Sequence, residues 1–288
     1  MTSEVMDGPR PAPYHRPMAR PAVGELVRDW RTRRRRSQLD LALDVGVSTR
    51  HLSCVETGRS RPSPELILAL AHHLEVPLRE RNAMLLAAGY APRYGQRGLD
   101  DPAMSNVRGA IQRMLDAHDP YPGVVVDRAW NVVLGNRSAL GLVAGVGDAV
   151  LGPPLNVYRL CLHPAGLATR TTNFLEWAGH LLHQLRRSIL LTGDPALMAL
   201  QDEVLAYPTV QQIVPLLSPV APDEPSILVP FRLSTPLGEV ATFTALTSFG
   251  TPGDVTLDEL AVELFYPADD TSAGRLRELG ALTDATAR

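Results

Sequence analysis

The side chains with the most informative chemistry share one side of a short predicted helix: Thr49, Arg50, Ser53 and Cys54. Leu52 and Val55 form the opposite, apolar side of the same helix. A guanidinium group such as that of Arg50 hydrogen-bonds bidentately to O6 and N7 of guanine, and small polar side chains can contact base edges. This pattern favours insertion of the helix into the major groove of duplex DNA.

Two other clusters suggest different chemistry. Glu176, His180 and His183 fall on one helix face, and imidazole and carboxylate groups suit zinc or nickel. Cys161 and His163 could form a thiol–imidazole pair, but the sequence offers no third group to orient it. Because Walker, Rossmann, zincin and kinase motifs are absent, we expect no enzyme activity and no cofactor. A metal-responsive protein remains an alternative.

The elements that must position this face are two helices and a tight turn between Ser37 and Gly58. Ser37 can cap the first helix, with Asp40 three residues later in a capping box. The apolar surface of that helix is expected from Leu39, Leu41, Ala42 and Leu43. Gly46 ends it, and Ser48 caps the second helix.

This stretch resembles the helix-turn-helix of XRE (xenobiotic-response-element) or phage-repressor-like regulators, over Val23 to Pro92. The resemblance is carried by Gln38, Ala42, Gly46, Val47, Leu52, Val55, Glu56, Gly58, Arg59, Arg61 and Pro62. It implies a five-helix all-α DNA-binding domain with an ion pair between Glu56 and Arg31. The implied DNA contacts are Gln38, Ser48, Thr49, Arg50, Ser53, Cys54, Arg59 and Arg61.

Charge divides the chain into two parts. Residues 1–97 contain 16 arginines and 10 acidic residues, whereas residues 98–288 contain 12 arginines and 21 acidic residues. The positive part coincides with the helix-turn-helix, as phosphate binding requires. Two cysteines make no disulfide framework, and no apolar run approaches the roughly 20 residues of a membrane helix. We therefore expect a cytoplasmic protein.

The DNA-binding domain is expected over residues 21–92. Apolar spacing predicts its other helices over residues 23–34, over about 64–74 after the Ser63 cap, and over 78–88 before Gly89. Residues 1–20 are rich in proline and arginine and predict a disordered arm. The basic run Arg31–Arg36 is open to two interpretations, phosphate contact and a solvated helix face. Residues 93–105 lack periodicity and predict a linker.

The second half alternates helices with β-branched runs. Val124–Val126 and Trp130–Leu134 predict a hairpin, and a broad apolar stripe predicts a long helix over 172–191. Other helices are expected over 106–117, 137–143, 156–162 and 195–206. From Ile227 the period switches to two, and three further strands are expected. The result is an α+β domain with an antiparallel sheet of about five strands and helices over one face.

The order of these elements, with segments 119–139 and 173–182 and the late strands, resembles the MmyB-like ligand-binding domain, a PAS-like fold. The boundaries are 106–275 for this domain and 276–288 for a tail. The resemblance implies a fatty-acyl-like ligand between sheet and helices. The expected ligand contacts are Tyr121, Val124, Val126, Trp130, Val132, Phe174, Trp177, Leu181, Leu185, Phe231 and Phe243. The candidates for a head-group partner are Tyr121, Arg128, Arg137 and Arg170.

These observations predict a bacterial transcription regulator that reads an operator and senses a small apolar ligand. Double-stranded DNA and a second copy of the chain are the expected partners, because one such helix-turn-helix reads only a few base pairs. RNA polymerase is a further candidate partner. The alternatives are a metal-responsive regulator and a regulator whose C-terminal domain is a ligand-free interaction or dimerisation module.

Overall fold

The computed structural model describes residues 22–217 and 228–286. The predicted arm over residues 1–20 and the predicted strand residue Ile227 lie outside these ranges. The chain forms two compact units, divided in sequence between Arg93 and Tyr94. No helix within the described ranges is long and apolar enough to cross a bilayer.

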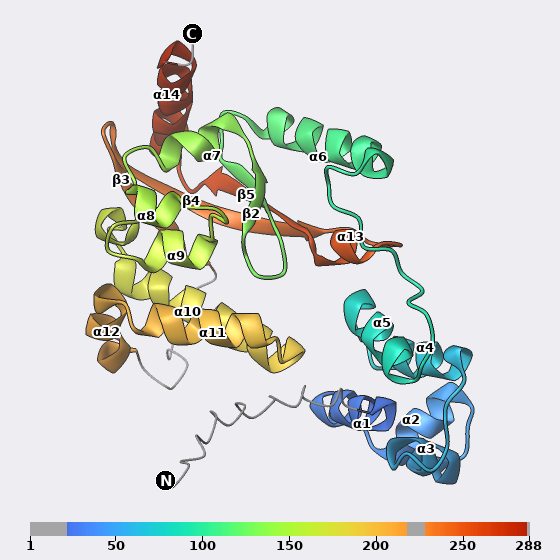
Figure 1. The fold of residues 1–288 in the computed structure, drawn as a ribbon. Helices are drawn as coiled ribbons and strands as arrows, with labels where there is room; N and C mark the ends of the chain where they lie inside the picture. The colour runs from blue at the N-terminus through green and yellow to red at the C-terminus, as the bar shows by residue number, and fades with distance from the viewer. Residues whose placement is uncertain (1–21, 218–227, 287–288) are drawn as a thin grey trace, which may run out of the picture. The chain divides into compact units, whose positions relative to one another are not determined.

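The first unit is all-α (Figure 1). Within residues 22–93 its helices are α1 (Val23–Arg33), α2 (Gln38–Val45), α3 (Thr49–Glu56), α4 (Pro64–His73) and α5 (Leu78–Ala87). The hydroxyl groups of Ser37, Ser48 and Ser63 each accept a backbone N–H from three residues further on. Gly46, at a φ of 73°, ends α2 and allows the tight turn that leads to α3. The predicted five-helix domain is confirmed.

Helix α2 contributes fewer side chains to the core than its apolar content suggests. Leu41 and Ala42 are buried, whereas Leu39 is 56% and Leu43 is 70% exposed. The prediction of a common apolar surface is therefore wrong for Leu39 and Leu43. Those two residues lie one turn apart, so they share a face, and an eight-residue helix buries only its other face here.

Helices α1 and α3 come into close contact at Gly24. A Cβ atom at this position would lie 2.2 Å from the carbonyl oxygen of Val55, closer than any real contact. Only glycine therefore permits this packing. The close approach also brings Arg31 of α1 next to Glu56 of α3.

The second unit contains a five-stranded sheet surrounded by helices (Figure 1). Its strands are β1 (Gly123–Val126), β2 (Val132–Gly135), β3 (Phe231–Thr235), β4 (Gly238–Ser248) and β5 (Ala261–Pro267). Its helices are α6 (Ser105–His118), α7 (Arg137–Leu142), α8 (Asp148–Leu151), α9 (Val157–Leu162), α10 (Phe174–Thr192), α11 (Pro195–Leu205), α12 (Pro208–Ile213), α13 (Val255–Glu259) and α14 (Asp270–Thr286). The strand order is β2-β1-β5-β4-β3 and every pairing is antiparallel, which confirms the predicted α+β class.

Both faces of the sheet are covered. On one face, Val125 and Val262 pack with Leu115 of α6. On the other face, Phe231 packs with Trp177 and other residues of α8 to α11. The expectation of helices over one face is therefore wrong, because successive strand residues point to opposite sides and both sets are apolar.

The unit also extends beyond its predicted boundaries. Leu99 and Met104, in the predicted linker, are buried beside Ile111 of α6, so residues 94–105 belong to the second unit. Of the predicted tail over 276–288, residues 276–286 belong to α14, whose Leu276 is buried in the same core as Phe231 and Trp177. Helices α8, α12 and α13 have four to six residues each, which is too short for a periodic pattern to reveal them in the sequence.

The two edge strands of the sheet are partly covered by loop segments. Beside β3, the backbone N–H of Thr172 donates to the Arg232 carbonyl at 3.0 Å, and the Arg232 N–H donates to Asn173 Oδ1 at 3.2 Å. Beside β2, the Val132 N–H donates to the Leu155 carbonyl at 2.7 Å. Hydrogen-bonding groups at both edges are therefore used within the chain.

Candidate functional site

In the first unit, helix α3 separates a buried face from an accessible one. Leu52 and Val55 are buried, and Arg50 is exposed. The neighbouring Thr49, Ser53 and Cys54 are half-buried. The four residues expected to read bases therefore occupy the side of α3 away from the core.

The carboxylate of Glu56 lies beneath this face, and its side chain is fully buried. It accepts hydrogen bonds from Arg31 Nε at 2.6 Å, from Arg31 Nη2 at 2.9 Å and from Gln38 Nε2 at 2.7 Å. Burial raises the pKa of Glu56, but these hydrogen bonds and the charges of Arg31 and Arg28 outweigh it and lower the pKa. The pair anchors α1, α2 and α3 to one another. The expected ion pair is present, and Gln38 belongs to the same network.

The basic residues near α3 differ in how far they are already engaged. Arg59 is exposed in the loop after α3, where Gly58 has a φ of 72°. Arg61 donates from Nε to the Ala88 carbonyl at 2.9 Å and lies 4.5 Å from the centre of the Tyr90 ring. Arg61 thus caps the C-terminal end of α5, a role that its local sequence does not reveal.

The run Arg31–Arg36 is also largely engaged within the domain. Arg34 donates to the Leu74 carbonyl at 2.9 Å and lies over the Trp30 ring, and Arg36 pairs with Asp44. These contacts orient the run along the ends of helices. The run is therefore more than a solvated helix face, and its contact with phosphate stays a prediction.

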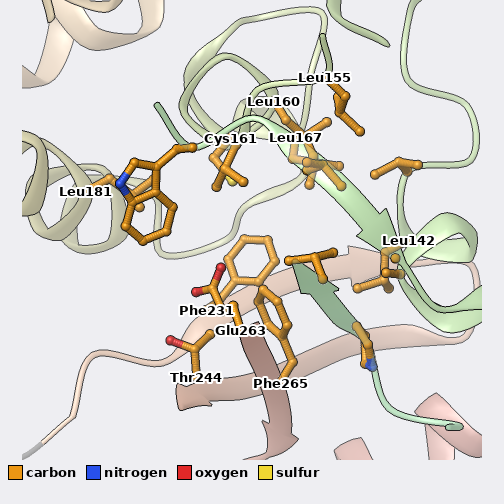
Figure 2. Close-up of a pocket in the computed structure, with 18 of the residues that line it drawn as sticks. Leu142, Leu155, Leu160, Cys161, Leu167, Leu181, Phe231, Thr244, Glu263 and Phe265 are labelled. Carbon is orange, nitrogen blue, oxygen red and sulfur yellow. The ribbon is translucent and has the colours of Figure 1, made fainter. Parts of the chain in front are cut away.

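In the second unit, the candidate site is a cavity of about 110 Å³ between the sheet and helices α7, α9 and α10. Figure 2 shows Phe231 and Phe265 on the sheet side, and Leu160, Cys161 and Leu167 across the space. Its walls are mostly apolar, as is typical of a small-molecule site. A cavity needs only about 10–15 Å³ to hold a water molecule, so this one has room for a small apolar group.

Six of the predicted ligand contacts line the cavity: Val124, Trp130, Val132, Trp177, Leu181 and Phe231. The cavity also has lining residues that were not predicted, chiefly Leu142, Val143, Leu155, Val157, Leu160, Cys161, Leu167, His180, Gln184, Thr244, Glu263 and Phe265. Leu160 and Cys161 lie on α9, which has six residues and is too short for periodicity to reveal its inner face.

Five predicted contacts are not among the lining residues. Phe243 stacks on Tyr266, because its neighbour Thr244 faces the cavity and successive residues alternate. Val126 is buried in the core just after a register irregularity in the β1–β2 pairing. The residues of α10 that line the cavity run from Trp177 to Gln184, and Phe174 and Leu185 lie just outside this stretch. Both pack in the hydrophobic core that contains Trp177 and Phe231, and Tyr121 packs against the same core.

The four residues predicted to bind the head group of a ligand also do not line the cavity. Arg128 pairs with Asp194 and with Glu259, the latter at 3.1 Å. Arg170 donates to the carbonyl oxygens of Leu142 and Ala144 at 3.2 Å each. No arginine among the described residues lines the cavity. An acyl carboxylate would therefore find no cationic partner in its walls.

The cavity instead contains a buried acid. Glu263 is 7% exposed, and burial raises its pKa to about 7, although a hydrogen bond from Thr244 acts in the opposite direction. Burial also raises the pKa of the Cys161 thiol to about 12 and lowers the pKa of His180. At pH 7 the Cys161 thiol is therefore neutral, and the Glu263 carboxyl is close to half-protonated.

The two alternative clusters do not assemble. Within residues 22–217 and 228–286, no group of three or more His, Cys, Asp or Glu side chains is placed to hold a metal ion. The ring of His180 stacks on the Trp177 ring, with 5.5 Å between the ring centroids. It does not form an ion site with Glu176 and His183. The ring of His163 contacts Tyr207 at 4.9 Å, and its Nδ1 accepts the Ala165 N–H.

Comparisons with known proteins agree with this division of the chain. A family model described as the MmyB-like transcription regulator ligand binding domain matches residues 107–279. A second model, a helix-turn-helix domain, matches residues 22–84. None of the curated proteins compared with the chain matches it significantly.

Proposed function

The chain belongs to the MmyB-like transcription regulators, and from this premise we propose that its cavity holds a fatty-acyl-like ligand that controls operator binding. The chain as a whole is a DNA-binding transcription regulator with a ligand-binding domain. The single observation that supports the finer proposal is the largely apolar cavity of about 110 Å³ between sheet and helices. Burying a methylene group there would contribute about 0.8 kcal/mol.

We propose that α3 reads bases in the major groove and that the loop after it contacts phosphate. Arg50 is exposed on the outer face of α3, and a guanidinium is the preferred reader of guanine. Thr49, Ser53 and Cys54 would contact adjacent base edges. The sugar-phosphate backbone of the DNA would be contacted by Gln38, Ser48, Arg59 and Arg61. Gln38 and Arg61 would contact the DNA with the N–H donors that they do not use for hydrogen bonds inside the domain.

Arg50→Ala should weaken binding of the full-length protein to DNA selected from a random pool by about 1–3 kcal/mol and relax the preference at one position. Arg59→Ala is the matched control. It should weaken binding to every sequence equally and reduce the salt-dependence slope by about 1. Fluorescence anisotropy at several salt concentrations measures both. If Arg50→Ala keeps the full sequence preference, the assignment of α3 is wrong.

The second proposed partner is another copy of the chain. Two recognition helices placed one DNA turn apart, about 34 Å, would read a pseudo-palindromic operator. The first unit uses most of its apolar residues in its own core, so we propose that the second unit carries the dimer contact. Light scattering of the full-length protein at micromolar concentration should give a dimer. A monomer both with and without operator DNA would contradict this.

Fatty acids of increasing chain length should raise the melting temperature of the full-length protein progressively and then cease to add stability when the cavity is full. Trp177→Ala should weaken this response, because the indole lines the cavity. Leu185→Ala is the control on the same helix, since Leu185 is buried outside the lining. It should lower stability but leave the chain-length response in place. No response at any length, either to fatty acids or to the corresponding alcohols, would favour the interaction-module alternative.

A ligand can control operator binding only if it binds two arrangements of the protein with different affinity. We propose that filling the cavity changes how the second unit presents its dimer contact, and hence the spacing of the two recognition helices. Operator affinity measured with and without saturating ligand gives the coupling free energy, for which about 1–3 kcal/mol is typical.

A further inference from the structure

Among the polar residues that line the cavity, Glu263 fits a purely apolar ligand least. Glu263 lies near the middle of β5, the central strand of the sheet, opposite Val124 of β1 and Leu246 of β4. Its neighbours Val262 and Leu264 point to the other face of the sheet and pack with the α6 cluster. Glu263 therefore faces the cavity, where an apolar residue would otherwise be expected.

The carboxyl group of Glu263 is also incompletely hydrogen-bonded. Figure 2 shows it beside Phe231 at the cavity, with Thr244 on the adjacent strand. Its Oε2 atom is buried and has no hydrogen-bond partner among the described residues. Buried polar atoms in native proteins are almost always paired, so an unpaired atom at a cavity wall needs an explanation. A polar group on a ligand would supply the missing partner.

The surroundings limit which polar group this is. The hydroxyl of Thr244 hydrogen-bonds to Glu263, and His180 and Gln184 line the same cavity from α10. No arginine of the described residues lines it. A ligand carboxylate placed here would meet a second acid without a compensating cation, and two neighbouring acids resist ionising together. A hydroxyl group carries no charge and donates a hydrogen bond that a carboxyl oxygen accepts whether or not the acid is ionised.

We propose that the cavity selects a largely apolar ligand that carries a hydroxyl group, and that this hydroxyl donates a hydrogen bond to Oε2 of Glu263. Thr244 holds the other part of the carboxyl group in place. The proposal rests on the proposed function, because it assigns the polar end of a ligand whose apolar part fills the same cavity. Glu263 is thus the residue that distinguishes an alcohol from a free fatty acid.

The test uses the full-length protein with 1-decanol and decanoate at pH 7.5, probes that differ only in the polar end. Trp130 and Trp177 line the cavity, so tryptophan fluorescence reports binding. The wild-type protein should bind 1-decanol at least about tenfold more tightly than decanoate, a difference of about 1.4 kcal/mol. Glu263→Leu should lose this preference, whereas Glu263→Gln should keep most of it, because the amide retains an acceptor oxygen.

Thr244→Val provides a second test in case Glu263→Leu does not fold. It leaves the carboxyl group in place but removes its hydrogen-bond partner, and it should weaken 1-decanol binding several-fold. Equal or tighter binding of decanoate, or an unchanged preference in Glu263→Leu, would overturn the role of Glu263 and leave the proposed function intact. If neither probe changes the fluorescence, both the hydroxyl selection and the apolar-ligand proposal are wrong.

Discussion

Replacement of Glu56 with alanine should destabilise the DNA-binding unit by about 3–5 kcal/mol, the range observed when one member of a buried ion pair is removed. The Glu56 side chain is fully buried, and that of Arg31 is only 15% exposed. Without the carboxylate, the Arg31 guanidinium loses its two hydrogen bonds to Glu56, at 2.6 and 2.9 Å, and keeps the one to the Arg36 carbonyl. Gln38 loses its partner at 2.7 Å as well. Urea unfolding of the full-length protein measures the loss.

Asp29→Ala is the control, because Asp29 is an exposed acid on α1 and its loss should change stability by less than about 0.5 kcal/mol. The pH dependence offers a second check. The pKa of Glu56 is lowered in the folded state, so its stabilisation is present above the ordinary pKa of 4.5 and declines as the pH falls below that value. If Glu56→Ala lowers the free energy of unfolding no more than Asp29→Ala does, the contacts of Glu56 with Arg31 and Gln38 contribute little to stability.

The second large effect concerns pH and Glu263. Its pKa rises from 4.5 in the unfolded chain to about 7 in the folded protein, so the folded state retains a proton that the unfolded state has released. The stabilisation is complete below about pH 4.5 and is lost as the pH rises through 7. At about 1.4 kcal/mol per pKa unit, the loss is about 3 kcal/mol. Chemical denaturation of the full-length protein across pH 4.5–8 measures it.

Glu263→Gln isolates this effect, because the amide does not titrate. The other titratable groups near Glu263 are His180 on α10 and Cys161 and Tyr158 on α9. The raised pKa values of Cys161 and Tyr158 keep both neutral over this range. His180 has a lowered pKa and acts oppositely below about pH 6.5, but equally in both proteins. The difference between wild type and Glu263→Gln should therefore change by about 3 kcal/mol, and a constant difference would contradict the shift.

Local signals account for what could be predicted from the sequence. The serine caps at Ser37, Ser48 and Ser63 and the glycine at position 46 are short-range features, and each stands where the structure has it. The strands after residue 228 were recognisable because their period-two pattern is clear. The same reasoning found the exposed face of α3, since Leu52 and Val55 mark its buried side.

Features that depend on tertiary pairing could not be predicted. A glutamate in a strand is usually expected to face solvent, and only the pairing of β5 between β1 and β4 buries Glu263. Phe243 looks like a pocket residue by composition, but the register of β4 turns Thr244 inward instead. The contact of Arg61 with the Ala88 carbonyl could not be predicted either, because Ala88 lies 27 residues further along the chain, beyond any local pattern.

The loop segments along the sheet edges limit how two copies of this chain can associate. An open edge offers unpaired N–H and C=O groups to a strand from another molecule, and it leads to continuous sheets and aggregation. Here Thr172 and Asn173 occupy positions along β3, and Leu155 occupies the start of β2. Strand exchange or fibre growth would first have to displace these segments. A dimer of this protein should therefore be built from side chains on helices and loops, not from a sheet that runs through both copies.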